Sequence, residues 1–437
     1  MTIWDKEMKL SIIKFLILTS VMLAALKASA FGSFEPRTMA MSGANLVRSR
    51  GLEGALLNPA NLGLENNGSF NLKLFSVGAT AGNNSLTLQD YNHISGDFLN
   101  NHEKKTLLGA IPSSGFRAST ELDLLLLGIS TGRMALTVDL RSAESLHLPK
   151  DLFDLALFGN TLDRTYDLGG DDLGDAWTVA ATTLSYGKKI NTGIVKNFSL
   201  GVGIKHLMGI NYGKMGGEID LTTSESGFTN KGYVEILSAG ETAFDTRKLS
   251  MNGSGFAFDL GLACQVDRHW SFGISLMNLN NGITWKKDTK KRTLDMALDG
   301  MSLLNESGML SGNEIIEQTD SLGMICRSRY PATFAAGLAY ETQYLSTEID
   351  VKKGFYNGAG SGTRWQIMQG IELRLLSILP IRAGVGILDN RTLVFSSGCG
   401  IKLGFINLDA AASSLGLPGY GIRGFGMSLS TGMEFGK

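Results

Sequence analysis

The sequence predicts an all-β protein: a closed antiparallel transmembrane β-barrel of about 14 strands, with an N-terminal plug and a few short helices in loops. Three observations predict this fold. Apolar residues alternate with small or polar residues over long stretches, the stronger stretches run to about 9 to 14 residues, and no part of the mature chain resembles a spanning helix of about 20 apolar residues. Glycine supplies 55 of the 437 residues without a collagen repeat.

The first 30 residues have the layout of a secretory signal peptide. Lysines at positions 6, 9 and 14 precede an apolar run over 15–26, and Ala28-Ser29-Ala30 follows. We expect cleavage after Ala30. The alternative is an N-terminal membrane anchor, but the apolar run is shorter than the roughly 20 residues that cross a bilayer as a helix.

Residues 31–67 lack the alternation and are predicted to form a plug or hatch segment inside the barrel. Pro59 fixes its own φ and moves Asn58 out of the helical region, which indicates a capped turn among short helical pieces. A disordered leader is the alternative, but small and apolar residues favour a plug. The candidate plug residues are Arg37, Met39, Gly43, Asn58, Pro59 and Ala60.

Residues 68–437 are predicted to form the transmembrane β-barrel. In the segment 133–141, Met134, Leu136 and Val138 share one parity, which is typical of a strand with one apolar face. Strands that cross a membrane need about 9 to 11 residues, whereas strands of soluble proteins usually have about 5 or 6. The same alternation recurs at 198–205, 256–266, 270–276, 345–352, 364–374 and 425–435.

The second parity of these strands decides which face meets lipid. It consists mostly of Gly, Ser, Ala and Thr with charges of both signs, which suits a confined polar lumen, so the apolar parity should face acyl chains. Lipid also requires closure, because an unpaired backbone group in hydrocarbon costs several kcal/mol. The charges predicted to face the lumen are Asp139, Arg141, Lys205, Asp259, Glu348, Asp350, Arg364, Glu372, Arg374 and Arg382. They either hold the sheet and plug together or set pore selectivity.

Other features support or compete with this interpretation. Trp177, Trp270, Trp285 and Trp365 lie near predicted strand ends, as expected for an interfacial aromatic belt. Helices are predicted over 104–111 and 149–158, and the longest excursion between strands, 286–327, opens with the basic run KKDTKKR, read as a solvated loop or as a contact with acidic lipid. A secreted β-sandwich or propeller is the alternative fold, but no repeat of about 40 to 50 residues favours blades.

The sequence gives no sign of catalysis, a metal or a cofactor, and we expect no enzyme. Lys and Arg total 40 against 41 for Asp and Glu, which excludes a basic nucleic-acid surface. The five histidines are scattered, and the cysteines Cys264, Cys326 and Cys399 read as incidental thiols. The segment 358–362 lacks the Lys of a phosphate-binding loop and reads as a flexible turn. A site on the outer rim, as in barrel lipases, is the alternative.

Several segments resemble a known superfamily. RTMAMSGA at 37–44 and LLNPANLG at 56–63 resemble the hatch of FadL-like outer-membrane barrels, the long-chain fatty-acid transporters, and of their PorV/PorQ-like relatives of type IX secretion. The resemblance implies about 14 strands, a lumenal plug and, in the transporters, a lateral gap for a hydrophobic ligand. Asn58, Pro59 and Ala60 match the hatch turn, whereas the chain ends Phe435-Gly436-Lys437 rather than on an aromatic residue.

These observations lead to two hypotheses about function. The first is a barrel of the bacterial outer membrane, in contact with its lipid, that binds or passively transports hydrophobic small molecules. The alternative is a PorV-like scaffold that partners secreted proteins in secretion or surface attachment. Neither hypothesis involves a nucleic acid.

Overall fold

The computed structural model describes residues 35–65, 67–94, 98–191, 197–224, 227–240, 250–302, 311–388, 392–419 and 421–436. The signal peptide predicted over 1–30 lies outside these ranges. Within them, no helix has both the length and the apolar character that a membrane span requires.

Fourteen strands form a closed antiparallel barrel, as the alternation predicts. Each strand pairs with the next one around the wall, and Phe70 pairs with Phe435 to close the ring. Closure leaves the barrel without a free edge. The wall consists of β1 (Phe70–Asn83), β2 (Phe116–Thr131), β3 (Met134–Leu148), β5 (Gly170–Ile190), β6 (Asn197–Ser224), β8 (Gly253–Gln265), β9 (Trp270–Leu279), β14 (Thr333–Glu341), β15 (Leu345–Gly354), β16 (Gln366–Leu376), β17 (Leu379–Ile387), β18 (Leu393–Leu403), β19 (Ile406–Leu415) and β20 (Gly424–Phe435).

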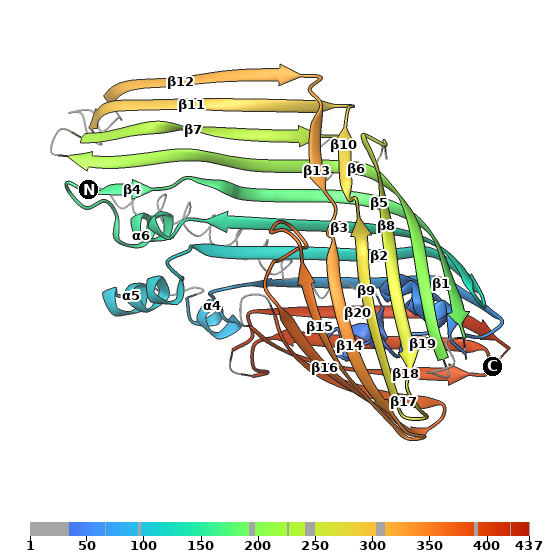
Figure 1. Cartoon of the computed structure of the whole chain (residues 1–437). Helices are drawn as coiled ribbons and strands as arrows, with labels where there is room; N and C mark the ends of the chain where they lie inside the picture. The colour runs from blue at the N-terminus through green and yellow to red at the C-terminus, as the bar shows by residue number, and fades with distance from the viewer. Residues whose placement is uncertain are drawn as a thin grey trace.

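The two ends of the barrel differ. Short turns join strands at one end, such as Gly132-Arg133 between β2 and β3, where Gly132 has φ 60°. The other end carries the long loops, with helices α4 (Leu88–Ile94), α5 (Asn101–Ala110) and α6 (Lys150–Phe158) at the left of Figure 1. We call these the turn end and the loop end. Short turns on one side and long loops on the other are typical of outer-membrane barrels. The helices predicted over 104–111 and 149–158 correspond to α5 and α6.

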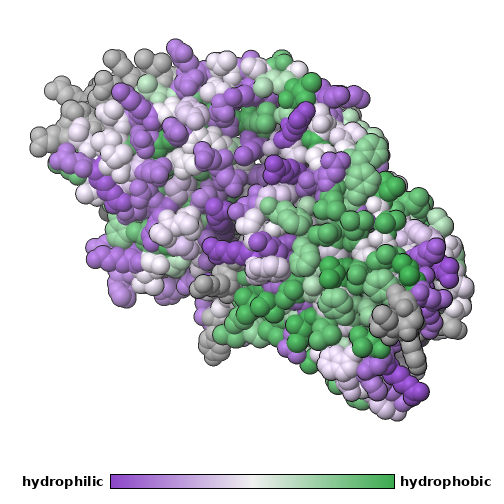
Figure 2. All heavy atoms as spheres, in the orientation of Figure 1, coloured by the Kyte–Doolittle hydropathy of each residue, from purple (hydrophilic) through white to green (hydrophobic). Residues whose placement is uncertain are grey.

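The apolar parity of the strands faces outward. On β6, Leu200, Val202 and Ile204 are 43%, 48% and 54% exposed, whereas Ser199 and Lys205, on the opposite parity, are buried. Figure 2 shows a broad hydrophobic surface over the barrel strands and a mostly hydrophilic surface over the loop end. An apolar band of this kind is stable against lipid and unfavourable in water.

A second sheet continues the barrel wall at the loop end. The distal half of β6 pairs with β7 (Gly227–Ala239), which pairs with β11 (Thr289–Ser302), which pairs with β12 (Ser311–Leu322). We call β7, β11 and β12 the sheet extension, and Figure 1 shows it at the upper left. Shorter strands complete this end: β4 (Thr165–Asp167) beside β6, and β10 (Gly282–Trp285) between β8 and β13 (Cys326–Arg329).

The sheet extension corrects the prediction of a long loop over 286–327. Strand β11 occupies the first part of this range and includes the apolar Leu294 and Met296. It also includes the basic residues Lys290, Lys291 and Arg292. Lys291 pairs with Glu235 at 2.5 Å, and Arg292 pairs with Asp320 at 2.9 Å. These cross-strand partners explain why a run of positive charge is tolerated in a strand.

The N-terminal segment, residues 35–65, lies inside the barrel. Its helices are α2 (Pro36–Ala40), α3 (Gly51–Leu57) and the 3-10 helix η1 (Pro59–Gly63). Helix α2 contacts β17 to β20, α3 contacts β1 to β3, and η1 contacts β5, β6 and β8. A segment that touches so many strands around the ring occupies the lumen, and most of its side chains are buried.

Candidate functional site

Glycines in the wall let the N-terminal segment approach the strands closely. The Asn58 side chain accepts a hydrogen bond from the Ala60 amide at 3.1 Å and caps η1, and it donates to the Leu262 carbonyl of β8 at 3.0 Å. A Cβ at Gly201 would lie 2.1 Å from the Ala60 nitrogen, and one at Gly261 would lie 2.1 Å from Asn58 Oδ1. The inward glycines of β6 and β8 are therefore required by the turn that they contact.

Two carboxylates of β15 bind the backbone of the N-terminal segment. Glu348 accepts hydrogen bonds from the amides of Val47 at 2.6 Å and Arg48 at 3.1 Å, and Asp350 accepts one from the Leu46 amide at 2.9 Å. Both carboxylates are 1% exposed. Charge-assisted bonds of this type are stronger than neutral ones, so β15 holds the turn over 44–48 in place.

Ion pairs between the wall and the N-terminal segment form a second set of contacts. Glu372 on β16 binds Arg382 on β17 at 2.7 Å and Arg37 on α2 at 3.1 Å. Because single buried charges are unfavourable, such pairs fix the partners relative to each other. Two further pairs join the segment to the wall, Lys73 with Glu35 at 2.5 Å and Arg48 with Glu341. Two neighbouring pairs join strands of the wall to each other, Arg382 with Asp409 at 2.6 Å and Arg374 with Glu341 at 2.6 Å.

Nearer the loop end, charged residues of different strands meet in the lumen. Arg141 on β3 binds Asp123 on β2 at 2.7 Å. Lys205 on β6 lies 3.4 Å from Asp259 on β8 and donates to the Asn278 side chain. Of these residues, the alternation placed Arg141, Lys205 and Asp259 on the lumenal parity, but it could not identify their partners.

A cavity of about 120 Å³ lies between the N-terminal segment and this part of the wall. Its lining combines apolar side chains with charged and polar groups. An engineered cavity of about 150 Å³ holds benzene, so the volume suits the body of a small ligand. The apolar lining includes Leu46, Leu56, Leu57, Met277, Pro331, Ala335, Met368 and Leu388, and the polar lining includes Asp139, Arg141, Lys205, Asn278, Asp350, Lys352 and Gln366.

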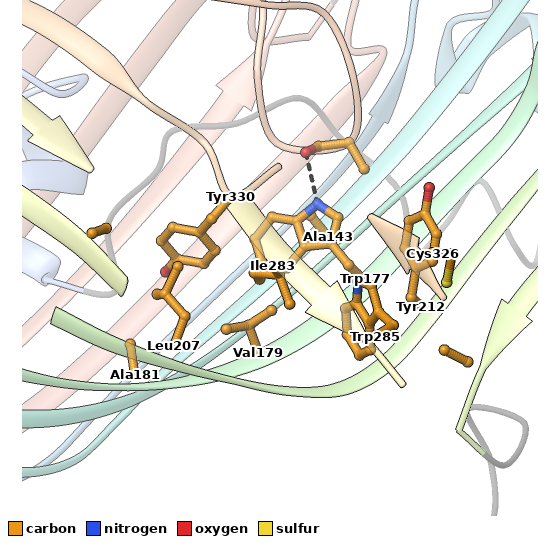
Figure 3. Packing of buried hydrophobic residues seen from close by; sticks show 13 residues of the cluster. Ala143, Trp177, Val179, Ala181, Leu207, Tyr212, Ile283, Trp285, Cys326 and Tyr330 are labelled. Carbon is orange, nitrogen blue, oxygen red and sulfur yellow. Dashed lines mark hydrogen bonds between the residues drawn. The ribbon is translucent and has the colours of Figure 1, made fainter. Parts of the chain in front are cut away.

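An aromatic cluster packs inside the barrel near this cavity (Figure 3). Trp177 packs against Tyr330 with ring centroids 5.2 Å apart, and Tyr212 stacks on Trp285 at 5.5 Å. Trp177 also donates from Nε1 to the Ala359 carbonyl at 3.0 Å. The loop after β15 is thus folded inward and pinned at its tip, rather than forming the free turn that the segment 358–362 predicted.

This cluster corrects part of the predicted aromatic belt. Trp177 and Trp285 are 5% and 0% exposed and lie in the interior, because their strand parity points inward at the loop end. Trp270 and Trp365 are 43% and 53% exposed and keep the outward orientation that a belt needs.

A second cavity, of about 110 Å³, has a different lining. Residues from the start of β1 and the end of β20 line it, which places it at the turn end of the barrel, on the other side of the N-terminal segment. It is rich in charge. Its charged lining residues are Arg37, Arg50, Glu53, Lys73, Arg382, Lys402, Asp409 and Glu434.

Most of the predicted plug residues and lumenal charges take part in the contacts or line the cavities described above. Met39 is buried in α2, and Gly43 has φ 100°, a conformation that favours glycine. Arg364 is the exception among the predicted lumenal charges: it is exposed and lies in the loop between β15 and β16, because that strand begins only at Gln366.

Sequence reasoning missed other residues of the cavity. Lys352 is not among the candidate lumenal charges, although the alternation places it on the same parity as Glu348 and Asp350. Asn278 and Tyr330 lie at or beyond strand ends, where alternation carries no signal. The described part of the chain contains no group of three potential metal-ligating side chains.

Several solved structures are similar to this chain at low sequence identity. The solved structures that it resembles include the toluene transporter TbuX of Ralstonia pickettii (14% identity, covering 93% of this chain and 100% of that one, TM-score 0.48). They also include a FadL homologue of Pseudomonas aeruginosa (13%, 92% and 98%, 0.49) and the P. putida toluene transporter TodX (11%, 93% and 100%, 0.49).

No curated protein matches the sequence. One family model does match, over residues 59–369, which extend from the 3-10 helix η1 to the middle of β16. This range is more than half of the chain, and the protein therefore belongs to the family of unknown function DUF5723.

Proposed function

We propose that the protein is a barrel of the bacterial outer membrane that binds hydrophobic small molecules and lets them pass without covalent chemistry. The observation that carries the proposal is the cavity between the N-terminal segment and the wall, whose lining includes leucine and methionine side chains. Binding sites for small molecules are usually concave and mostly apolar with a few polar groups. The names of the similar barrels agree with such cargo, but the proposal rests on the cavity.

The N-terminal segment acts as a plug in this proposal. Hydrogen bonds to Glu348 and Asp350 and ion pairs to Glu372 hold it against the wall. An apolar molecule that moved straight past it would enter the charged cavity at the turn end, where desolvation of the charges is unfavourable. Passage straight through the turn end is therefore unfavourable for such a ligand.

A crystal soak tests this proposal at the level of the site. Crystals of the detergent-extracted protein are soaked with bromobenzene, and the anomalous signal of bromine locates the probe. We expect a peak in the cavity beside Met368 and Leu57. The absence of bromine from the cavity, with peaks confined to the lipid-facing surface, would contradict the proposal.

Two neighbouring positions on β14 provide a matched pair of variants. Ala335 lines the cavity, whereas Ala336 has the opposite parity, shared with the exposed Leu338. Ala335→Phe should fill the cavity and remove the bromine peak, and Ala336→Phe should leave the peak in place. Cells that produce the two variants should differ in the same way in bromobenzene uptake.

The sheet extension favours a second candidate function, a scaffold for exported proteins at the cell surface. Within the part of the chain that the structure describes, β12 pairs with β11 and its other edge has no strand partner. Open edges can accept a strand from another chain. If this candidate is right, secreted proteins should co-purify with the intact barrel, and deletion of residues 289–322 should abolish their capture while bromobenzene binding persists.

A further inference from the structure

Most lumenal charges near the cavity have a partner. Arg141 is neutralised by Asp123 at 2.7 Å, with Glu121 at 3.9 Å, and Lys205 lies 3.4 Å from Asp259. On the N-terminal segment's side, Asp350 binds the Leu46 amide at 2.9 Å. These residues line or adjoin the cavity, and each has at least one protein partner, although the second carboxylate oxygen of Asp350 receives no hydrogen bond from the described residues.

Asp139 on β3 differs from these residues. Its side chain lines the cavity and is only 4% exposed. Among the described residues no group donates a hydrogen bond to its carboxylate, and no cationic nitrogen lies within 4.0 Å. Lys205 and Arg141 attract this carboxylate only at longer range, so a ligand that donates a hydrogen bond to it directly would gain a strong interaction.

Lys352 on β15 is the second charge of this kind. Its side chain is half-buried and lines the same cavity. No hydrogen bond or ion pair within 4.0 Å involves its ammonium group in the described parts of the chain. The cavity therefore presents a carboxylate and an ammonium group that, among the described residues, have no hydrogen bond and no ion pair within 4.0 Å.

The remainder of the lining sets the shape of a ligand. Leu57, Met277 and Met368 offer an apolar surface that a charged or polar body would not satisfy. The volume of about 120 Å³ fits a ring or a branched aliphatic group. A plain hydrocarbon would fill this volume but would leave Asp139 and Lys352 without partners.

We propose that the cavity prefers a small zwitterion with an apolar body, of the chemical class of the hydrophobic amino acids. The ligand's ammonium group faces Asp139, its carboxylate faces Lys352, and its side chain packs on the leucines and methionines. This inference rests on the proposed function because it assigns a ligand class to the same cavity. No bond is made or broken.

A series of probes with one phenyl body separates the two contacts. L-phenylalanine carries both charges, phenethylamine carries the ammonium group, 3-phenylpropionate carries the carboxylate, and 3-phenylpropan-1-ol carries neither. Isothermal titration into the detergent-extracted barrel gives their affinities. We expect L-phenylalanine to bind about 10- to 100-fold more tightly than phenethylamine or 3-phenylpropionate, each of which lacks one charged contact, and the alcohol to bind most weakly.

Two variants should give a crossed pattern that a folding defect cannot produce. Asp139→Asn should weaken L-phenylalanine and phenethylamine about tenfold or more and leave 3-phenylpropionate unchanged or tighter. Lys352→Met should weaken L-phenylalanine and 3-phenylpropionate and spare phenethylamine. Asp295→Asn, at an exposed position of β11 in the sheet extension, is the matched control and should change none of the affinities.

The outcomes separate this inference from the proposed function. Equal affinity for all four probes would overturn the preference for a zwitterion, because the two charges would then be satisfied through water, and the binding of bromobenzene in the cavity would still stand. Absence of bromobenzene from the cavity would overturn the proposed function. Binding of L-phenylalanine that Asp139→Asn and Lys352→Met leave unchanged would place the probe elsewhere and overturn the inference.

Discussion

Strand β6 passes through two environments, and its two halves differ accordingly. From Asn197 to Gly209 it belongs to the barrel wall between β5 and β8, and from Tyr212 to Ser224 it pairs with β7 of the sheet extension. The register with β5 shifts between the halves, at Thr178/Val179. The backbone remains a strand throughout, so only the pattern of side chains shows where the part of the strand that faces lipid and lumen ends.

The side chains of the two halves follow opposite rules. In the wall half, apolar Leu200 and Ile204 are exposed while Lys205 is buried. In the distal half, the exposed residues are charged, among them Lys214 and Glu218. This inversion is expected if lipid surrounds the first half and water surrounds the second. It teaches that one strand can be divided between solvents without a break in its hydrogen bonding.

The largest difference in the free energy of unfolding should be between variants of the two β6 lysines, Lys205 and Lys214. Lys205→Met removes the cation beside Asp259, a carboxylate that is 1% exposed and otherwise receives a bond from the Asn278 amide at 2.7 Å. Loss of one partner of a buried pair costs about 3 to 5 kcal/mol. Lys214→Met, at an exposed position, should change the free energy of unfolding by less than about 0.5 kcal/mol. Urea unfolding in phospholipid vesicles, followed by the mobility of unboiled samples on gels, measures both; similar values for the two variants would show that the lumen is open to water at Lys205.

Charges introduced on the outward face should distinguish lipid from water. Ile204→Lys places an ammonium group against acyl chains and should cost about 2 to 4 kcal/mol in the same unfolding assay. Met215→Lys, in the distal half, should cost less than about 1 kcal/mol because an exposed lysine remains hydrated. If Ile204→Lys were equally mild, the exposed apolar surface of the wall would not be in contact with lipid.

Two glycines of β6 give the next effect. At Gly201 a Cβ would lie 2.2 Å from the Pro59 carbonyl carbon, whereas at Gly213 it would meet no atom within 4 Å. Overpacking of this kind costs about 1 to 3 kcal/mol, so Gly201→Ala should lower the stability and increase protease cleavage of the N-terminal segment. Gly213→Ala should do neither. Equal protease resistance of the two variants would show that η1 does not rest against β6.

The barrel could be predicted from the sequence because its signal is local. Each strand carries its own alternation, as in Leu200 to Ile204, and closure follows from the requirement that lipid places on backbone groups. The hairpin of β11 and β12 also carries this signal at Leu294 and Met296, but the basic run beside it suggested a loop. The charge of this basic run is compensated by Asp320 and Glu235, which are distant in sequence. The sequence alone therefore does not show that so many positive charges can lie in a strand.

The cavity could not be predicted because its parts come from all over the chain. Leu57 belongs to the N-terminal segment, Asp139 to β3 and Lys352 to β15. Parity predicts that a charged side chain faces the lumen, but it gives neither the position of that side chain along the barrel axis nor its partner. Parity alone therefore does not distinguish Arg141, which forms an ion pair with Asp123, from Asp139, which forms none within 4.0 Å among the described residues.

The smallest effect should come from the ion pairs of the sheet extension, which are hydrated. Arg292 donates to Asp320 at 2.9 Å and Lys290 lies 2.9 Å from it, and these contacts hold the pKa of this exposed carboxyl below its ordinary value of 3.8. A depressed pKa stabilises the folded hairpin above pH 3.8, and this contribution is lost as the pH falls through the lower pKa of the folded state.

Asp320→Asn should therefore speed amide hydrogen exchange in β12 slightly at pH 6, relative to the intrinsic rates. The difference from the natural protein should shrink at pH 3 and in high salt. A difference that is unchanged by acid and salt would assign the effect to packing rather than to charge, and would remove the contrast between the hydrated pairs of the extension and the buried pair of Lys205 and Asp259.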